Sequence, residues 1–244
     1  MISTWIRSSR WALAIIPLMF IAALGCIPRE GESFYLDDII KKDFHQWTAD
    51  ECNKVLSQTM STNMMNPAGN SPAMIFALPC TPVVLMANNR KQQLEANWTV
   101  EQSNQKLDQQ ARSCAGLVYD SAQNRFIDLH GNIYRTPNQL DSLMILVTVD
   151  KRFAYNAHDF NVSDMEQHIF LEDEKNLLLR SSSVRLQEQG DVKGYTTFAV
   201  MFHFGDEQPY FTKNIEDNLR LIVTGFGNPV TLPLRLDTPV AQNR

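Results

Sequence analysis

Apolar residues recur with a helical period in the first half of the chain and with a strand period in the second. Thr48-Ala-Asp-Glu51 has the spacing of a capping box, in which the first and fourth residues satisfy each other's free backbone donors. Thr99 and Gln102 repeat this spacing. The helical face after the second start comprises Val100, Leu107, Ala111, Cys114 and Val118. The pattern predicts helices over residues 35–44, 49–60 and 99–115.

The segment between the second and third predicted helices contains two short apolar runs. Residues 61–72 contain Asn, Gly and Pro and are expected to form a loop. Ala73–Leu78 and Val83–Met86 then flank the Pro-Cys-Thr-Pro sequence of residues 79–82. Short apolar runs bounded by such turn residues predict two short strands.

Beyond residue 117 the apolar period shortens to two, which predicts strands. The predicted strands are residues 125–134 around a turn at 130–132, 143–149, 169–173, 176–180, 195–204, 218–224 and 230–236. Residues 143–149 are apolar on both faces, as in a strand that is covered on both sides. Pro233 cannot donate to a ladder, so we expect the last strand at a sheet edge.

Alternation is clearest in Tyr195–Phe204. One face of this strand carries four apolar residues: Phe198, Val200, Phe202 and Phe204. Thr197 and His203 belong to the other face, because successive side chains of a strand point to opposite sides. We therefore expect the four apolar side chains to be buried and those of Thr197 and His203 to be exposed.

The N-terminal residues 1–25 differ from the rest of the chain. Arg7 and Arg10 precede an unbroken apolar run, Trp11–Gly25, and Cys26 follows it. A permanent membrane-spanning helix needs about 20 apolar residues. The run is shorter than that, and a charged start, apolar middle and small residues at the end are the order of an export signal.

The sequence Ala22-Ala-Leu-Gly-Cys26 resembles the lipobox of bacterial lipoproteins. The resemblance implies cleavage before Cys26, a diacylglycerol on its sulfur and a short tether over residues 26–34. Ile27, where Asp would favour retention in the inner membrane, implies transfer to the outer membrane. Two alternatives remain open: cleavage after Gly25 to release a soluble secreted domain, and retention of the segment as a signal anchor.

The order of the predicted elements indicates an α+β fold. A helical N-terminal third precedes an antiparallel β-sandwich in the C-terminal half. The strand pattern of this half is similar to the immunoglobulin-like sandwiches of other exported lipoproteins. We expect a helical and mixed region over residues 35–120 to pack with a sandwich over residues 121–238 as one body.

The charge of the chain excludes one class of partner. The formal net charge is −5 and becomes −7 when Arg7 and Arg10 leave with the signal, and no basic cluster remains. A nucleic-acid binder needs such a basic surface, so we expect no nucleic-acid partner. The acidic body also lacks the charge that would draw it to an anionic bilayer, so we expect membrane attachment only through the lipid on Cys26.

Lipidation of Cys26 would leave three cysteines: Cys52, Cys80 and Cys114. Export places them in a compartment where disulfides persist, and three thiols allow one bond. Cys80 lies in a turn bounded by prolines, and Cys114 lies near the end of a predicted helix. We therefore expect a Cys80–Cys114 disulfide and a free thiol at Cys52.

The sequence shows no motif of a known catalytic site. It lacks a Gly-x-Ser-x-Gly nucleophile elbow, a phosphate-binding loop and a dinucleotide fingerprint. His158, Asp164 and His168 are the one cluster that suits Zn²⁺ or Mn²⁺, provided that a helical turn brings Asp164 and His168 to one face. The alternative interpretation of the same residues is a solvated loop between strands.

The leading hypothesis is a non-catalytic, membrane-anchored envelope lipoprotein that binds another envelope protein or a glycan and holds no cofactor. Trp47 and Trp98 could stack on sugar rings, but at the starts of capped helices we expect them to pack onto the core. The alternatives are an exported hydrolase or metal-dependent enzyme with a site around residues 158–168, and a soluble secreted domain.

Overall fold

The structure of the chain is a computed structural model. It describes residues 36–65, 73–135, 139–150, 165–173, 175–186, 195–204, 219–224, 228–234 and 236. The helices are α2 (Leu36–Ile40), the 3₁₀ helix η2 (Phe44–Gln46), α3 (Ala49–Thr59), α4 (Pro82–Ala96) and α5 (Val100–Ala115). None of the helices in this part of the chain combines the length and the apolar character that a membrane span requires.

The described strands form three antiparallel sheets. They are β1 (Ser61–Met65), β2 (Ala73–Pro79), β3 (Val118–Asp120), β4 (Arg125–Ile127), β5 (Ser142–Asp150), β6 (Ile169–Glu172), β7 (Leu178–Arg180), β8 (Ser183–Leu186), β9 (Tyr195–His203), β10 (Arg220–Val223) and β11 (Val230–Pro233). One sheet has the order β1-β2-β5-β9-β8, a second has the order β11-β10-β6-β7, and β3 pairs with β4. This arrangement confirms the α+β class.

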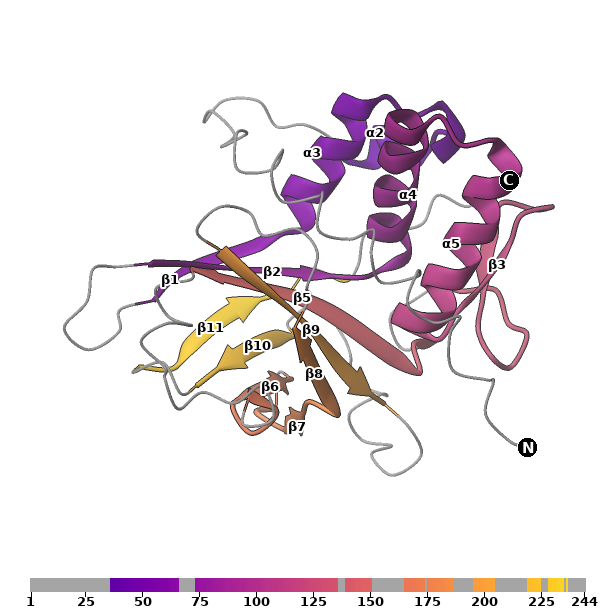
Figure 1. Cartoon of the computed structure of the whole chain (residues 1–244). Helices are drawn as coiled ribbons and strands as arrows, with labels where there is room; N and C mark the ends of the chain where they lie inside the picture. Colours follow the sequence, from indigo (N-terminus) through magenta and orange to yellow (C-terminus); the bar gives the residue numbers. More distant parts are fainter. Residues whose placement is uncertain are drawn as a thin grey trace, which may run out of the picture.

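Strand β5 lies at the centre of the five-stranded sheet, and every one of its residues is buried. The helices lie on one side of this sheet and the four-stranded sheet lies on the other (Figure 1). Both faces of β5 are therefore covered, which explains its apolar residues on both faces and confirms the strand predicted over residues 143–149. The first half of the chain contributes β1 and β2 to the same sheet, so it is not purely helical.

The two larger sheets are linked at both ends. At one end, the Ser61 hydroxyl donates to the Pro233 carbonyl, and Asn63 Nδ2 donates to the Thr231 carbonyl over 2.8 Å. Side chains of β1 thus contact the edge strand β11, where Pro233 has no N–H to donate. At the other end the chain passes directly from β7 into β8, and the Ser182 N–H donates to the Met201 carbonyl of β9 over 2.8 Å. The edge position predicted for Pro233 is confirmed.

Two of the three predicted helices are confirmed, and each begins at the residue that its capping box predicts. Helices α3 and α5 begin after complete capping boxes, Thr48 with Glu51 and Thr99 with Gln102. The third helix is shorter than predicted, because α2 ends at Ile40. On α5, Leu107, Ala111 and Cys114 are buried as expected, but Val100 is 53% exposed.

The prediction of a strand at Val83–Met86 is wrong, because these residues form the first turns of α4. Thr81 occupies the N-cap and Pro82 the first helical position, where its fixed φ suits a helix and its missing N–H costs nothing. A short apolar run does not distinguish a buried strand from a buried helix. The loop predicted over residues 61–72 is also wrong in part, since Ser61–Met65 forms β1.

The face pattern of β9 is confirmed for five of six residues. Phe198, Val200, Phe202 and Phe204 are buried, and His203 is exposed. Thr197 is buried, contrary to the prediction, and its hydroxyl lies 2.9 Å from the Thr148 hydroxyl of β5. The hydrogen bond between two hydroxyls on paired strands lets a polar residue be buried on this face. The hairpin predicted from residues 169–173 and 176–180 is confirmed by β6 and β7.

Candidate functional site

The predicted site residues fall partly outside the described structure. Cys26 and the lipobox lie outside it, and so do His158 and Asp164. His168 is described, as are Cys80, Cys114 and the leftover thiol Cys52.

His168 lies in the turn that precedes β6 and is held by Thr224. Its Nδ1 lies 3.1 Å from the Thr224 hydroxyl, and its carbonyl accepts the Thr224 N–H over 2.8 Å. Glu166 of the same turn accepts the Val184 N–H, and its carbonyl accepts Arg180 Nε. Within the described residues, no group of three His, Cys, Asp or Glu side chains is placed to hold a metal ion. These contacts connect the turn before β6 with β7, β8 and the end of β10.

The most concentrated chemistry in the described structure is a cluster of three buried sulfur-containing residues. Cys80 directly follows β2, and its N–H donates to the Met144 carbonyl of β5 over 2.9 Å. Cys114, in the last turn of α5, places Sγ 3.8 Å from Met144 Sδ. Cys80 and Cys114 are 2% and 1% exposed, and Met144 is 6% exposed. We name Cys80, Cys114 and Met144 the sulfur cluster.

The two thiols of the sulfur cluster interact with each other. Donation from Cys80 to Cys114 raises the pKa of Cys80 well above its ordinary value, and burial adds to the effect. The same hydrogen bond lowers the pKa of Cys114, with burial opposing it and Ser113 assisting. Both cysteines are free thiols in the structure. The fold therefore brings together the two residues of the predicted disulfide, while the bond itself stays a prediction.

Cys52 has a different environment. It lies in the first turns of α3, it is fully buried, and burial raises its pKa to about 12. A thiol that stays protonated and covered is a poor nucleophile. All three described cysteines are free thiols in the structure, so the role of Cys52 as the unpaired thiol stays a prediction.

Helix α4 carries a buried polar layer that the sequence did not reveal. Its members are Asn88, Asn89, Lys91, Gln92 and Gln93. Asn89 Nδ2 donates to the Ser103 carbonyl of α5 over 3.0 Å, and the Ser103 hydroxyl donates back to Asn89 Oδ1. Lys91 is 5% exposed, and its Nζ has no hydrogen-bond partner among the described residues. A buried ammonium without a partner is costly, which marks this layer as unusual.

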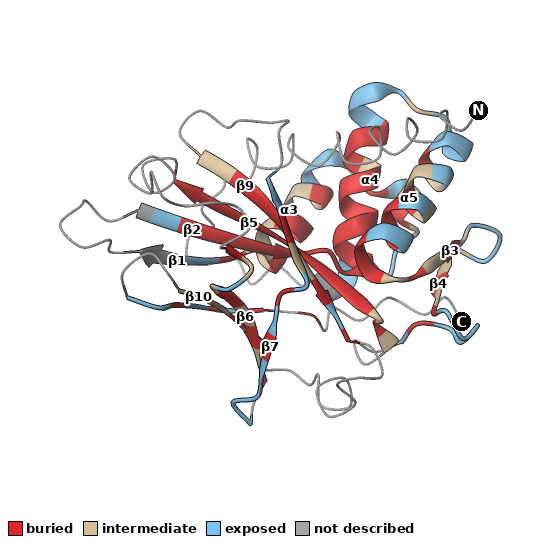
Figure 2. Cartoon of the chain, turned by 60° about the horizontal axis from the view of Figure 1, so that its bottom comes forward, coloured by how far each residue is buried: buried red, intermediate tan, exposed pale blue. Residues whose placement is uncertain are grey.

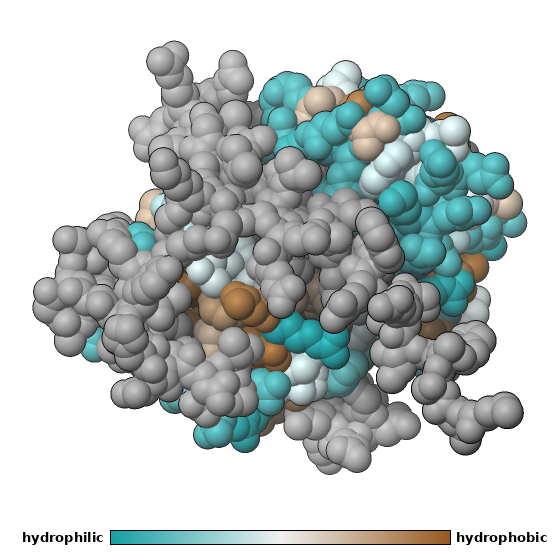
Figure 3. Space-filling view, viewed as in Figure 1, coloured by the Kyte–Doolittle hydropathy of each residue, from teal (hydrophilic) through white to brown (hydrophobic). Residues whose placement is uncertain are grey.

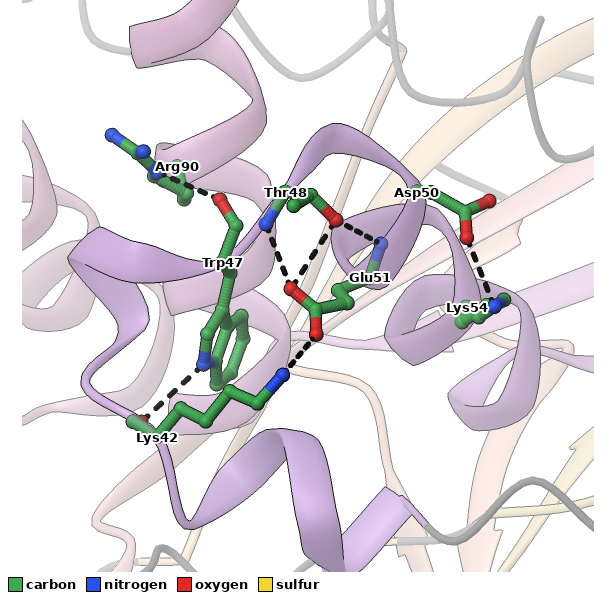
Figure 4. A network of polar contacts seen from close by, with 7 residues as sticks. All are labelled: Lys42, Trp47, Thr48, Asp50, Glu51, Lys54 and Arg90. Carbon is green, nitrogen blue, oxygen red and sulfur yellow. Dashed lines mark hydrogen bonds and ion pairs between the residues drawn. The ribbon is translucent and has the colours of Figure 1, made fainter.

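Trp47 belongs to the core and not to a sugar-stacking platform. It is 1% exposed, its Nε1 donates to the Lys42 carbonyl over 3.3 Å, and its carbonyl accepts Arg90 Nε of α4 over 3.0 Å (Figure 4). The packing predicted for Trp47 is thus confirmed. Trp98 is partly exposed, with Lys106 Nζ 4.0 Å from its ring centroid.

In comparisons with known proteins, no family model, no curated protein and no solved structure matches this chain.

Proposed function

We propose that the chain is a membrane-anchored envelope lipoprotein with a binding or structural role, held in the outer membrane by lipid on Cys26. The observation that carries the proposal is the N-terminal order: Arg7 and Arg10, the apolar run Trp11–Gly25, and then Cys26. One acyl chain gives only marginal attachment, whereas two or more give stable anchoring. A lipidated cysteine with at least two chains therefore needs no help from the acidic body.

The exposed face of α5 supports contact with a polar partner, an envelope protein or a glycan. Its exposed polar residues are Glu101, Gln102, Gln105, Gln109, Arg112 and Ser113. Amide side chains both donate and accept hydrogen bonds, which suits glycan hydroxyls as well as polar protein surfaces. The surface over the helices is hydrophilic, whereas hydrophobic residues are visible over the strands (Figure 3). In this proposal an immunoglobulin-like sandwich is the scaffold that presents the helical face.

The anchor is tested with Cys26→Ser in the native host. We expect wild-type protein in the detergent phase of a phase-separation assay, and Cys26→Ser in the aqueous phase or as an unprocessed precursor. Cys52→Ser is the matched control, because Cys52 is buried in α3 and its loss leaves the anchor in place. Intact mass of membrane-extracted protein should show a chain that begins at Cys26 with added lipid.

Two results would contradict the anchor. A mature chain that begins at Cys26 without added lipid mass would favour the soluble secreted domain. Equal partitioning of wild type and Cys26→Ser into the detergent phase would show that another segment binds the membrane.

The class of partner is tested by sedimentation with insoluble cell-wall glycan. If the exposed face of α5 binds glycan, the double variant Gln105→Arg and Gln109→Arg should sediment with the glycan less than wild type does.

A further inference from the structure

Along the chain, one cysteine of the sulfur cluster comes just before the α4–α5 hairpin and the other lies near its last residue, so both belong to the open end of the hairpin. Cys80 precedes α4 and Cys114 lies in the last turn of α5, and the two helices lie side by side (Figure 1). Gly116 ends α5 with φ +65°, and a side chain at this position would press on Asp141 and Ser142 at 3.3 Å. This close approach fixes the end of α5 beside the start of β5, where Met144 touches both cysteines.

We propose that Cys80 and Cys114 form a disulfide that closes the α4–α5 hairpin, and that the bond forms before α5 packs on β5. Met144 contacts both cysteines, Cys80 through the Cys80 N–H and Cys114 through its sulfur, and both side chains are buried beside it, so the pairing needs no change of fold. Thiol–disulfide exchange requires a donor sulfur to approach a thiolate. Thiols that are 1% and 2% exposed are closed to such a donor, so oxidation must precede burial. The disulfide proposal rests on the proposed export in one respect, the supply of oxidant, because disulfides form and persist in oxidising compartments.

The reaction is an exchange with an external disulfide. One cysteine thiolate attacks a sulfur of the donor, the donor bond breaks, and one donor thiolate leaves. The second cysteine thiolate then attacks the protein sulfur of the mixed disulfide and releases the other donor thiolate. The protein loses two protons and two electrons, and the donor becomes two thiols. Once α5 is packed, the same burial shields the new bond from reductants.

Refolding in a defined redox buffer tests the proposal. The full chain is unfolded and reduced in detergent, refolded with reduced and oxidised glutathione, alkylated and digested. We expect a linked Cys80–Cys114 peptide and an alkylated Cys52. The oxidised protein should melt roughly 6–12 °C above the reduced one, because the bond constrains a loop of about 35 residues in the unfolded state. Reduction should be on the order of 100-fold slower in native protein than in denaturant.

Single serine variants assign the effect to the pair. Cys52→Ser should retain the melting difference between oxidised and reduced protein, whereas Cys80→Ser and Cys114→Ser should each lose it. The difference is taken within each variant, so general destabilisation does not affect the comparison. A refolded protein in which Cys80 and Cys114 are both alkylated, or in which Cys52 is linked, would overturn the proposal. Two thiolates and a thioether also suit Cu(I); a pair that stays reduced and competes with a Cu(I) chelator would assign the cluster to metal instead.

Discussion

Helices α4 and α5 are neighbours of nearly equal length, yet the core surrounds only one of them. Eleven of the fifteen residues of α4 are buried, against six of the sixteen residues of α5. Figure 2 shows α4 buried over most of its surface and α5 exposed along its outer side. Helix α5 has the amphipathic pattern of a surface helix. Helix α4 has no amphipathic pattern, because its polar residues are buried together with its apolar ones.

The difference shows what each helix needs from its surroundings. Helix α5 contributes a stripe of apolar residues and is otherwise solvated. Helix α4 packs between α3 and α5, so its buried polar groups need partners inside the protein. Asn89 forms hydrogen bonds with Ser103, and Arg90 donates a hydrogen bond to the Trp47 carbonyl. The stability of α4 therefore depends on tertiary hydrogen bonds, and that of α5 depends on one apolar face.

The largest expected effect comes from the apolar face of α5. Leu107 is fully buried, so Leu107→Ala should lower the free energy of unfolding by about 2–5 kcal/mol through lost transfer energy and a cavity. Val100→Ala is the matched control on the same helix, because Val100 is 53% exposed and should change stability by less than about 0.5 kcal/mol. Denaturant unfolding measures both. Equal losses in the two variants would show that α5 is not amphipathic in solution.

A smaller effect is expected from the polar link between the two helices. Asn89→Ala removes both hydrogen bonds to Ser103 inside the protein and should cost about 2 kcal/mol. Gln109→Ala, on the exposed side of α5, should be close to neutral. The two free energies of unfolding are compared at the same pH and salt. An Asn89→Ala protein as stable as Gln109→Ala would mean that the buried polar layer of α4 does not stabilise the fold.

The same contrast explains which helices the sequence predicts. Capping boxes and amphipathic faces are local signals, so α3 and α5 are predicted from Thr48, Glu51, Thr99 and Gln102. Helix α4 has no such face, and its apolar first turns resemble a strand. Thr81 followed by Pro82 is a helix-start signal that is present in the sequence, and it would have favoured a helix over the strand predicted at Val83–Met86.

The candidate site depends on contacts that no local pattern contains. The Cys80–Cys114 pairing was predicted from a proline-bounded turn and a helix end. Met144 was not part of it, because only the pairing of β2 with β5 brings that residue beside Cys80. Thr197 was expected to be exposed, since its partner Thr148 lies 49 residues away in sequence. Contacts between neighbouring strands join residues that are far apart in sequence, so a pattern within a short stretch of sequence does not predict them.

The smallest expected effect extends the comparison to the helix starts. The capping box of α3 uses Glu51, which accepts from Lys42 Nζ at 2.5 Å and from the Thr48 N–H at 2.9 Å. These two hydrogen bonds hold the pKa of Glu51 below its ordinary value of 4.5, and the bond from Lys42 has the larger effect. The stabilisation is therefore complete above the unfolded pKa and is lost as pH falls through the folded pKa. The box of α5 uses Gln102, which does not titrate.

Exchanging the two capping residues should exchange this acid sensitivity. Glu51→Gln should be less stable than wild type by less than about 1 kcal/mol at pH 7, and the gap should close as the pH approaches 3. Gln102→Glu should gain a few tenths of a kcal/mol at pH 7, where a carboxylate favours the helix N-terminus, and lose the gain in acid. Denaturant unfolding between pH 7 and pH 3 measures both. A Glu51→Gln protein that keeps the same gap to wild type at every pH would show that Glu51 stabilises α3 by packing and not by its charge.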